Sequence, residues 1–221
     1  MNKNRIVRAA ILDFYTVRPS LGTSLITYGV AILIGISTRQ PLFTSAFMMV
    51  FAVFTGGLVF SAHEKSHSEK LYGILPLGRM EMIAGRYLLA LMAGVISALF
   101  AGICSFEISL MVNADLDFTA LLFVLALAFD YYCFAVGVSY PIYFRFTFTK
   151  AYAFTMLPLY FLMLILIFLS RRTGLFDYVA QIGQFLTVNR WLIPIFGLCL
   201  GLVILAASSL IANSIYRQKE I

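Results

Sequence analysis

The chain has 221 residues, of which 62% are hydrophobic and only 12% are charged, and its mean hydropathy is +0.94. A soluble domain is closer to half apolar and a quarter charged, so this composition excludes a water-soluble globule. The formal net charge of +6 does not indicate a nucleic-acid partner, because the basic residues are scattered over chain ends and loops. Since the apolar runs are long and do not alternate like barrel strands, we expect an all-α membrane protein with a single transmembrane domain over residues 1–221.

The first predicted element is an amphipathic helix over residues 3–18 that lies in the membrane interface. Its apolar face is formed by residues at helical spacing, namely Val7, Ile11 and Phe14. Arg5 and Arg8 can reach lipid headgroups, and Pro19 is expected to end the helix. A purely anchoring role and a role in gating both remain open.

Six apolar runs follow, and each is predicted to cross the membrane as a helix. They cover approximately residues 21–37, 42–62, 83–110, 118–140, 151–170 and 191–215. Pro141 is expected to close the fourth span and Pro158 to kink the fifth. Residues 175–186 have one apolar and one polar face, which predicts a short interfacial helix. Residues 113–117 hold two aspartates but too few ligands for calcium, so we expect a solvated turn.

The basic residues predict the orientation of these spans. Six spans leave both termini on one side, together with the segments between spans 2 and 3 and between spans 4 and 5. That side would hold twelve basic residues: Lys3, Arg5, Arg8, Arg18, Lys65, Lys70, Arg79, Arg86, Arg145, Lys150, Arg217 and Lys219. The other side would hold four: Arg39, Arg171, Arg172 and Arg190. The positive-inside rule therefore places both termini in the cytoplasm of a multi-pass cell-membrane protein.

One short motif suggests a metal site. His63, Glu64 and His67 match H-E-x-x-H, which on a helix presents two imidazoles to zinc and a glutamate as general base. A catalytic zinc needs a third protein ligand, and none follows at a recognised spacing. We therefore favour the interpretation of these residues as a solvated helix end with no metal bound. A zinc-dependent intramembrane peptidase is the alternative.

Two acidic side chains fall within predicted spans. Asp130 lies near the middle of the fourth span and is followed by Tyr131, and Glu107 lies toward the outer end of the third. A carboxylate inside a membrane is costly, so these residues are candidates either for a substrate pathway or for interhelical contacts. The chain contains no G-x-x-x-x-G-K-[ST] motif, and therefore no P-loop for ATP.

The longest polar interruption runs from Glu64 to Tyr87, between the second and third spans. It contains an acidic-basic pair, Glu64-Lys65, a Leu75-Pro76-Leu77 turn followed by Arg79, and the sequence Arg86-Tyr87-Leu88. In these features it resembles the small ABC-2 type permeases, the membrane subunits of bacterial ABC exporters. The rest of the chain resembles that family in layout only.

The resemblance implies a cytoplasmic coupling segment at residues 63–83 that docks a separate ABC ATPase. The residues implied in this coupling are Glu64, Lys65, Glu69, Lys70, Leu71, Leu75, Pro76, Arg79 and Glu81. ATP and magnesium would bind the partner, and this chain would have no cofactor and no catalysis of its own. A second permease subunit, identical or not, would complete an export path for amphipathic cargo such as antimicrobial peptides, lipids or drugs. An assembly or immunity protein without transport is a further alternative.

Overall fold

The computed structural model describes residues 3–66, 78–155, 157, 161 and 192–218, and within these ranges the chain is helical and contains no strand. The all-α prediction is therefore confirmed for this part. The elements are α1 (Lys3–Val17), the 3-10 turn η1 (Arg18–Ser20), α2 (Leu21–Thr38), α3 (Pro41–Ser66), α5 (Arg79–Val112), α6 (Phe118–Arg145) and α9 (Leu192–Gln218). Residues 148–155 are also helical.

Five stretches of the described chain are long and apolar enough to cross a membrane. They are Arg5–Thr38, which joins α1 to α2, and Pro41–Lys65, Met80–Val112, Phe118–Arg145 and Ile195–Ile215. These stretches contain the first four predicted spans and most of the sixth. Most of the predicted fifth span, its kink at Pro158 and the whole predicted helix 175–186 lie outside the described residues.

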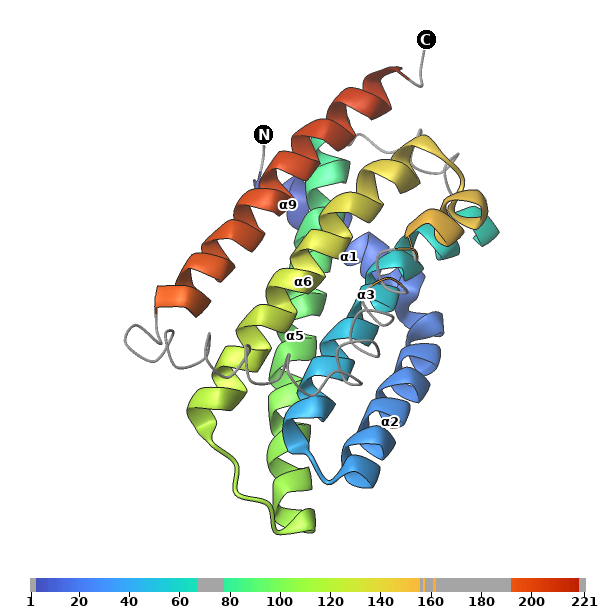
Figure 1. Cartoon of the computed structure of the whole chain (residues 1–221). Coiled ribbons are helices and arrows are strands. Elements are labelled where there is room, and N and C mark those ends of the chain that lie inside the picture. The colour runs from blue at the N-terminus through green and yellow to red at the C-terminus, as the bar shows by residue number, and fades with distance from the viewer. Residues whose placement is uncertain (1–2, 67–77, 156, 158–160, 162–191, 219–221) are drawn as a thin grey trace.

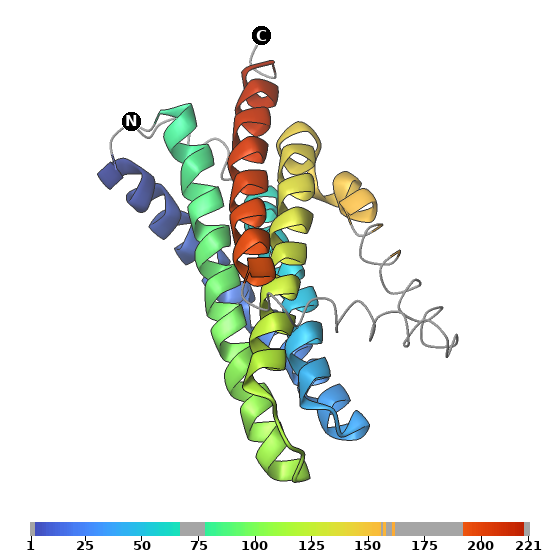
Figure 2. The same ribbon diagram turned by 60° about the vertical axis from the view of Figure 1, so that its left-hand side comes forward.

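The long helices form a bundle in which α3 packs against α2, α5 and α6, and α6 packs against α9. Figure 1 shows the start of α5 and the ends of α6 and α9 at the same end of this bundle. Figure 2 shows that α1 also begins at this end, and that it leans obliquely against α5. We call this the terminal end of the bundle. It also carries Ser66, the last residue of α3, and Arg79, the first residue of α5.

The predicted N-terminal helix is present and ends at Val17, one residue before the predicted boundary. Its predicted lipid-facing residues Val7, Ile11 and Phe14 are exposed, whereas Ala9 and Asp13 on the opposite side are fully buried. The backbone keeps right-handed helical dihedrals at Val17, Ser20 and Leu21, so α2 follows α1 without an intervening loop. Pro19 therefore sits in a tight turn between two helices that continue almost directly into one another.

Pro141 does not close the fourth span, because α6 continues to Arg145. Proline has no N–H, so it leaves the carbonyl of Gly137, four residues earlier, without its helical donor. The Ser208 hydroxyl of α9 donates a hydrogen bond to that carbonyl at 2.5 Å. A side chain from a neighbouring helix thus satisfies the freed backbone group, which is how proline is tolerated inside a spanning helix.

The two connections opposite the terminal end are short turns. Arg39 ends α2 and Asn113 ends α5, each with left-handed backbone dihedrals. Asp115 and Asp117 are exposed, in accordance with the predicted solvated turn. Asp117 also has a structural role, because its carboxylate accepts the Thr119 N–H at 2.9 Å and caps the start of α6.

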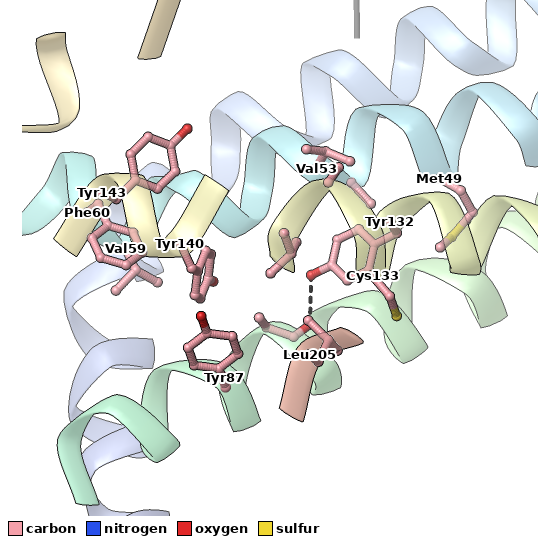
Figure 3. Close-up of a cluster of buried hydrophobic side chains, with 14 of the residues drawn as sticks. Met49, Val53, Val59, Phe60, Tyr87, Tyr132, Cys133, Tyr140, Tyr143 and Leu205 are labelled. Atoms are coloured by element: carbon pink, nitrogen blue, oxygen red, sulfur yellow. Dashed lines mark hydrogen bonds between the residues drawn. The ribbon is translucent and has the colours of Figure 1, made fainter. Parts of the chain in front are cut away.

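Buried tyrosines connect α6 to its neighbours in the core (Figure 3). The Tyr132 hydroxyl donates to the carbonyl of Ala90 in α5 at 2.7 Å, and the Tyr140 hydroxyl donates to the carbonyl of Gly56 in α3 at 3.0 Å. A hydroxyl buried without a partner would be costly, so these bonds select one register of α6 against α3 and α5.

Candidate coupling site

The segment 63–83 is bounded by two helices that extend further than predicted. Helix α3 continues four residues beyond its predicted end and includes His63, Glu64 and Lys65. Helix α5 begins at Arg79, four residues before the predicted start of the third span, and contains Glu81 in its first turn. The remaining predicted coupling residues lie outside the described residues: Glu69, Lys70, Leu71, Leu75 and Pro76.

Glu64 connects the end of α3 to the helical stretch that follows α6. Its two carboxylate oxygens accept the Thr149 N–H at 3.0 Å and the Thr149 hydroxyl at 2.7 Å. Residue 149 lies in the first turn of the helical stretch 148–155, where backbone N–H groups lack helical acceptors. A carboxylate at this position is doubly favoured, by the hydrogen bonds and by the helix dipole.

Glu81 has a comparable role at the start of α5. Its carboxylate accepts the Gly78 N–H at 3.0 Å, so it caps the helix that enters the bundle. Its other neighbour is Arg5 of α1, whose guanidinium lies 3.9 Å from the same carboxylate oxygen. Glu64 and Glu81 were predicted from the resemblance to couple to an ATPase, and the structure gives both of them partners within the chain.

Asp13, His63 and Arg86 form a buried ionic cluster near these capping contacts. Asp13 is not among the site residues predicted from the sequence. Asp13 of α1 is fully buried, and its Oδ1 atom accepts a hydrogen bond from Nε2–H of His63 in α3 at 2.8 Å. Its Oδ2 atom lies 3.6 Å from Nε of Arg86 in α5. Asp13 is the only acidic residue among the first 63 residues, which is the signal that could have singled it out.

Arg86 and Tyr87, which belong to the resemblance motif, anchor the start of α5 in different directions. The guanidinium of Arg86 lies 5.0 Å from the ring centre of Phe60 and 5.3 Å from that of Phe144. The Tyr87 hydroxyl is 2.6 Å from the Ser208 hydroxyl of α9. Because the Ser208 proton is donated to α6, the tyrosine is the donor in this pair. Arg86 thus connects α5 to α3 and α6, and the next residue, Tyr87, connects α5 to α9.

The H-E-x-x-H residues receive other roles in this arrangement. His63 is buried and bonds to Asp13, while Glu64 bonds to Thr149; His67 lies outside the described residues. Among the described residues, no group of three or more His, Cys, Asp and Glu side chains could hold a metal ion. The zinc-peptidase alternative receives no support from the described part of the chain.

The predicted intramembrane residues are not gathered into one site. Asp130 packs against α9, where a Cβ atom added to Gly197 would overlap with its Oδ2 atom. In the described part of the chain, the buried Oδ1 atom of Asp130 and the buried Tyr131 hydroxyl have no hydrogen-bond partner. Glu107 is exposed on α5. Asp130 therefore lies in a helix contact, and no interhelical hydrogen bond to a tyrosine is found for it in the described region.

Comparison with known families decides what kind of membrane protein this bundle is. The model of the family described as ABC-2 family transporter protein matches residues 11–217, which is nearly the whole chain. The chain belongs to the ABC-2 transporter family. Neither a search of curated proteins nor a search of solved structures found a match. As an ABC-2 permease, the chain is the membrane component of a transporter, and membership implies association with an ABC ATPase subunit.

Proposed function

We propose that this ABC-2 permease is the membrane subunit of an ATP-driven exporter and that its ATPase acts on residues 63–83 at the terminal end of the bundle. The observation that supports this proposal is the set of polar contacts at and next to the two ends of that segment. The segment begins in the last turn of α3 and ends in the first turns of α5, and these two helices are connected there to α1, to α6 and to residue 149. A displacement of the segment would therefore act on the bundle and not on a single helix.

In this mechanism the terminal end faces the cytoplasm, as the distribution of basic residues indicates. The partner would bind ATP and magnesium and supply the energy of hydrolysis, because this chain has no P-loop. A second permease subunit, identical or related, would complete the path. The ATPase would move the two bundles as rigid bodies against each other, a common way in which packed helices transmit a switch.

The proposed cargo class is amphipathic and includes peptides, lipids and drugs. An apolar, aromatic-rich bundle can accept such molecules from the lipid phase, and 15% of the residues are aromatic. Asp130 is the proposed polar element of the path, because it is the carboxylate nearest the middle of α6. Membrane lipid would cover the outward apolar faces.

The test is purification of the tagged chain from its native host in a mild detergent, followed by identification of co-eluting proteins and measurement of bound zinc. We expect a stoichiometric P-loop ATPase and no stoichiometric zinc. The double charge reversal Glu69→Lys/Lys70→Glu should lower the co-eluting ATPase by about tenfold, which corresponds to roughly 1.4 kcal/mol. The matched control is Asp115→Lys, which changes an exposed charge at the opposite end and should leave the yield unchanged.

Stoichiometric zinc without an ATPase would contradict the proposal and would favour a peptidase that uses His63, Glu64 and His67. An ATPase that is lost equally from the Asp115→Lys variant would contradict the placement of the docking site at residues 63–83.

A further inference from the structure

The contacts of α1 indicate a function beyond anchoring the chain to the membrane surface. Asp13 lies on its buried side and has no exposed surface. A carboxylate in such a position is stabilised only by close hydrogen-bonding or charged partners. It has both, since His63 donates to Oδ1 at 2.8 Å and Nε of Arg86 lies 3.6 Å from Oδ2. Three helices thus meet at one carboxylate.

Arg86 extends this cluster to a fourth helix. Its guanidinium lies within 5.3 Å of the ring centres of Phe60 in α3 and Phe144 in α6. A guanidinium within this distance of aromatic rings is attracted to their π-systems, and its charge also favours a nearby carboxylate. The positive charge of Arg86 therefore links the carboxylate of Asp13 to aromatic side chains of α3 and α6.

The backbones of α1 and α5 are also in close contact next to this cluster. A Cβ atom added to Gly85 would lie 2.8 Å from Cβ of Ala9 and 3.1 Å from the backbone nitrogen of Ala10. Small residues allow helices to approach in this way, and the short separation resists sliding. Together with the 3.9 Å contact between Arg5 and Glu81, this gives α1 a fixed register along the first turns of α5.

A movement of α1 would pass directly into α2. The backbone remains in the right-handed helical region at Val17, Ser20 and Leu21, and Pro19 restricts the turn between them. Helix α2 is therefore mechanically continuous with α1, although its own side contacts are made mainly with α3.

We propose that Asp13, His63 and Arg86 are positioning residues that fasten α1 to the helices flanking the coupling segment, so that α1 and α2 move with α3 and α5 as one body when ATP binds. This inference rests on the proposed function, in which an ATPase acts on residues 63–83. It assigns a role to a helix that contributes no residue to that segment.

The experiment uses the permease purified with its co-eluting ATPase. The three native cysteines are replaced by alanine, and spin labels are attached at exposed positions 25 of α2 and 111 of α5. Pulsed EPR measures the distance between the labels without nucleotide and after trapping with ATP and vanadate. In the otherwise unchanged chain, trapping should leave the distance distribution unchanged. In the Asp13→Asn variant, trapping should shift or broaden it, because α2 no longer follows α5.

A second pair of variants separates positioning from simple loss of folding. His63→Leu removes the donor to Asp13 and should show the same nucleotide-dependent shift. His63→Gln retains an N–H donor and should remain closer to the unchanged chain. Asp115→Asn alters an exposed carboxylate in the turn after α5 and serves as the control that should have no effect. ATP hydrolysis and the amount of co-eluting ATPase are recorded for each complex to show that it has assembled.

Two results would overturn the proposal: a nucleotide-dependent shift in the unchanged chain, or assembled Asp13→Asn and His63→Leu complexes that behave like the unchanged chain. A chain that purifies with no ATPase would instead refute the proposed function, and with it this extension. If Asp13→Asn does not assemble, the comparison of the two His63 variants decides the question.

Discussion

At the level of single residues, the position of the Asp130 side chain depends on glycine in the facing part of α9. Its Oδ2 atom occupies the space in which a Cβ atom of Gly197 would lie, and its Oδ1 atom is 3.1 Å from the corresponding position at Gly201. Two glycines four residues apart thus form the surface that receives the carboxylate. This contact explains how the side chain fits between two spanning helices, and it makes the two positions interdependent.

We predict that Gly197→Ala destabilises the permease by about 1–3 kcal/mol, because the added methyl group displaces either the carboxylate or α9. In an Asp130→Ala background, the same change should cost less than half as much, since the obstructing atoms are gone. The midpoint of thermal unfolding of the purified chain, recorded for both single variants and the double variant, measures the difference. Strictly additive effects would show that the two residues are not in contact.

At the scale of the element, the packing of α1 on α5 depends on small side chains. A Cβ atom added to Gly85 would overlap with Cβ of Ala9, whereas one added to Gly22, at the start of α2, would meet nothing within 4 Å in the described part of the chain. A larger residue would therefore meet a steric obstacle at position 85, but it would meet none among the described residues at position 22. Gly85 allows two backbones to approach, whereas no packing contact among the described residues calls for glycine at position 22.

Gly85→Ala should separate α1 from α5 and lower the stability of the bundle by about 1–3 kcal/mol. Gly22→Ala should be neutral or slightly stabilising, because alanine favours a helix by up to about 1 kcal/mol over glycine. Limited proteolysis near the N-terminus and thermal unfolding report on both variants. Equal stability of the two would argue against a close seam between α1 and α5.

At the scale of the whole molecule, the spanning helices could be predicted because their signal is local. An apolar run of sufficient length is forced into a helix by the lack of hydrogen-bonding solvent, whatever its neighbours are. The helix ends could not be predicted in the same way. The polar residues that extend α3 and the proline inside α6 are accommodated by partners far away in sequence, such as Thr149 for Glu64 and Ser208 for Gly137.

The candidate site was predicted only where a motif marked it. The resemblance identified Glu64 and Glu81, which lie near the two ends of the coupling segment, but it gave no reason to select Asp13. That residue acquires its importance from His63, fifty positions later, and from Arg86. Neither spacing nor hydropathy reports such a contact, because each depends only on neighbouring residues.

In the proposed mechanism an ABC ATPase docks at the terminal end of this bundle. The most direct measurement places a photoreactive amino acid at position 70 of the coupling segment or, as a control, at position 115 in the turn at the opposite end. After illumination of native membranes, we expect an adduct between the permease and a P-loop ATPase from position 70 and none from position 115. An ATPase adduct from position 115, or its absence from position 70 and neighbouring positions of the segment, would contradict the proposed mechanism.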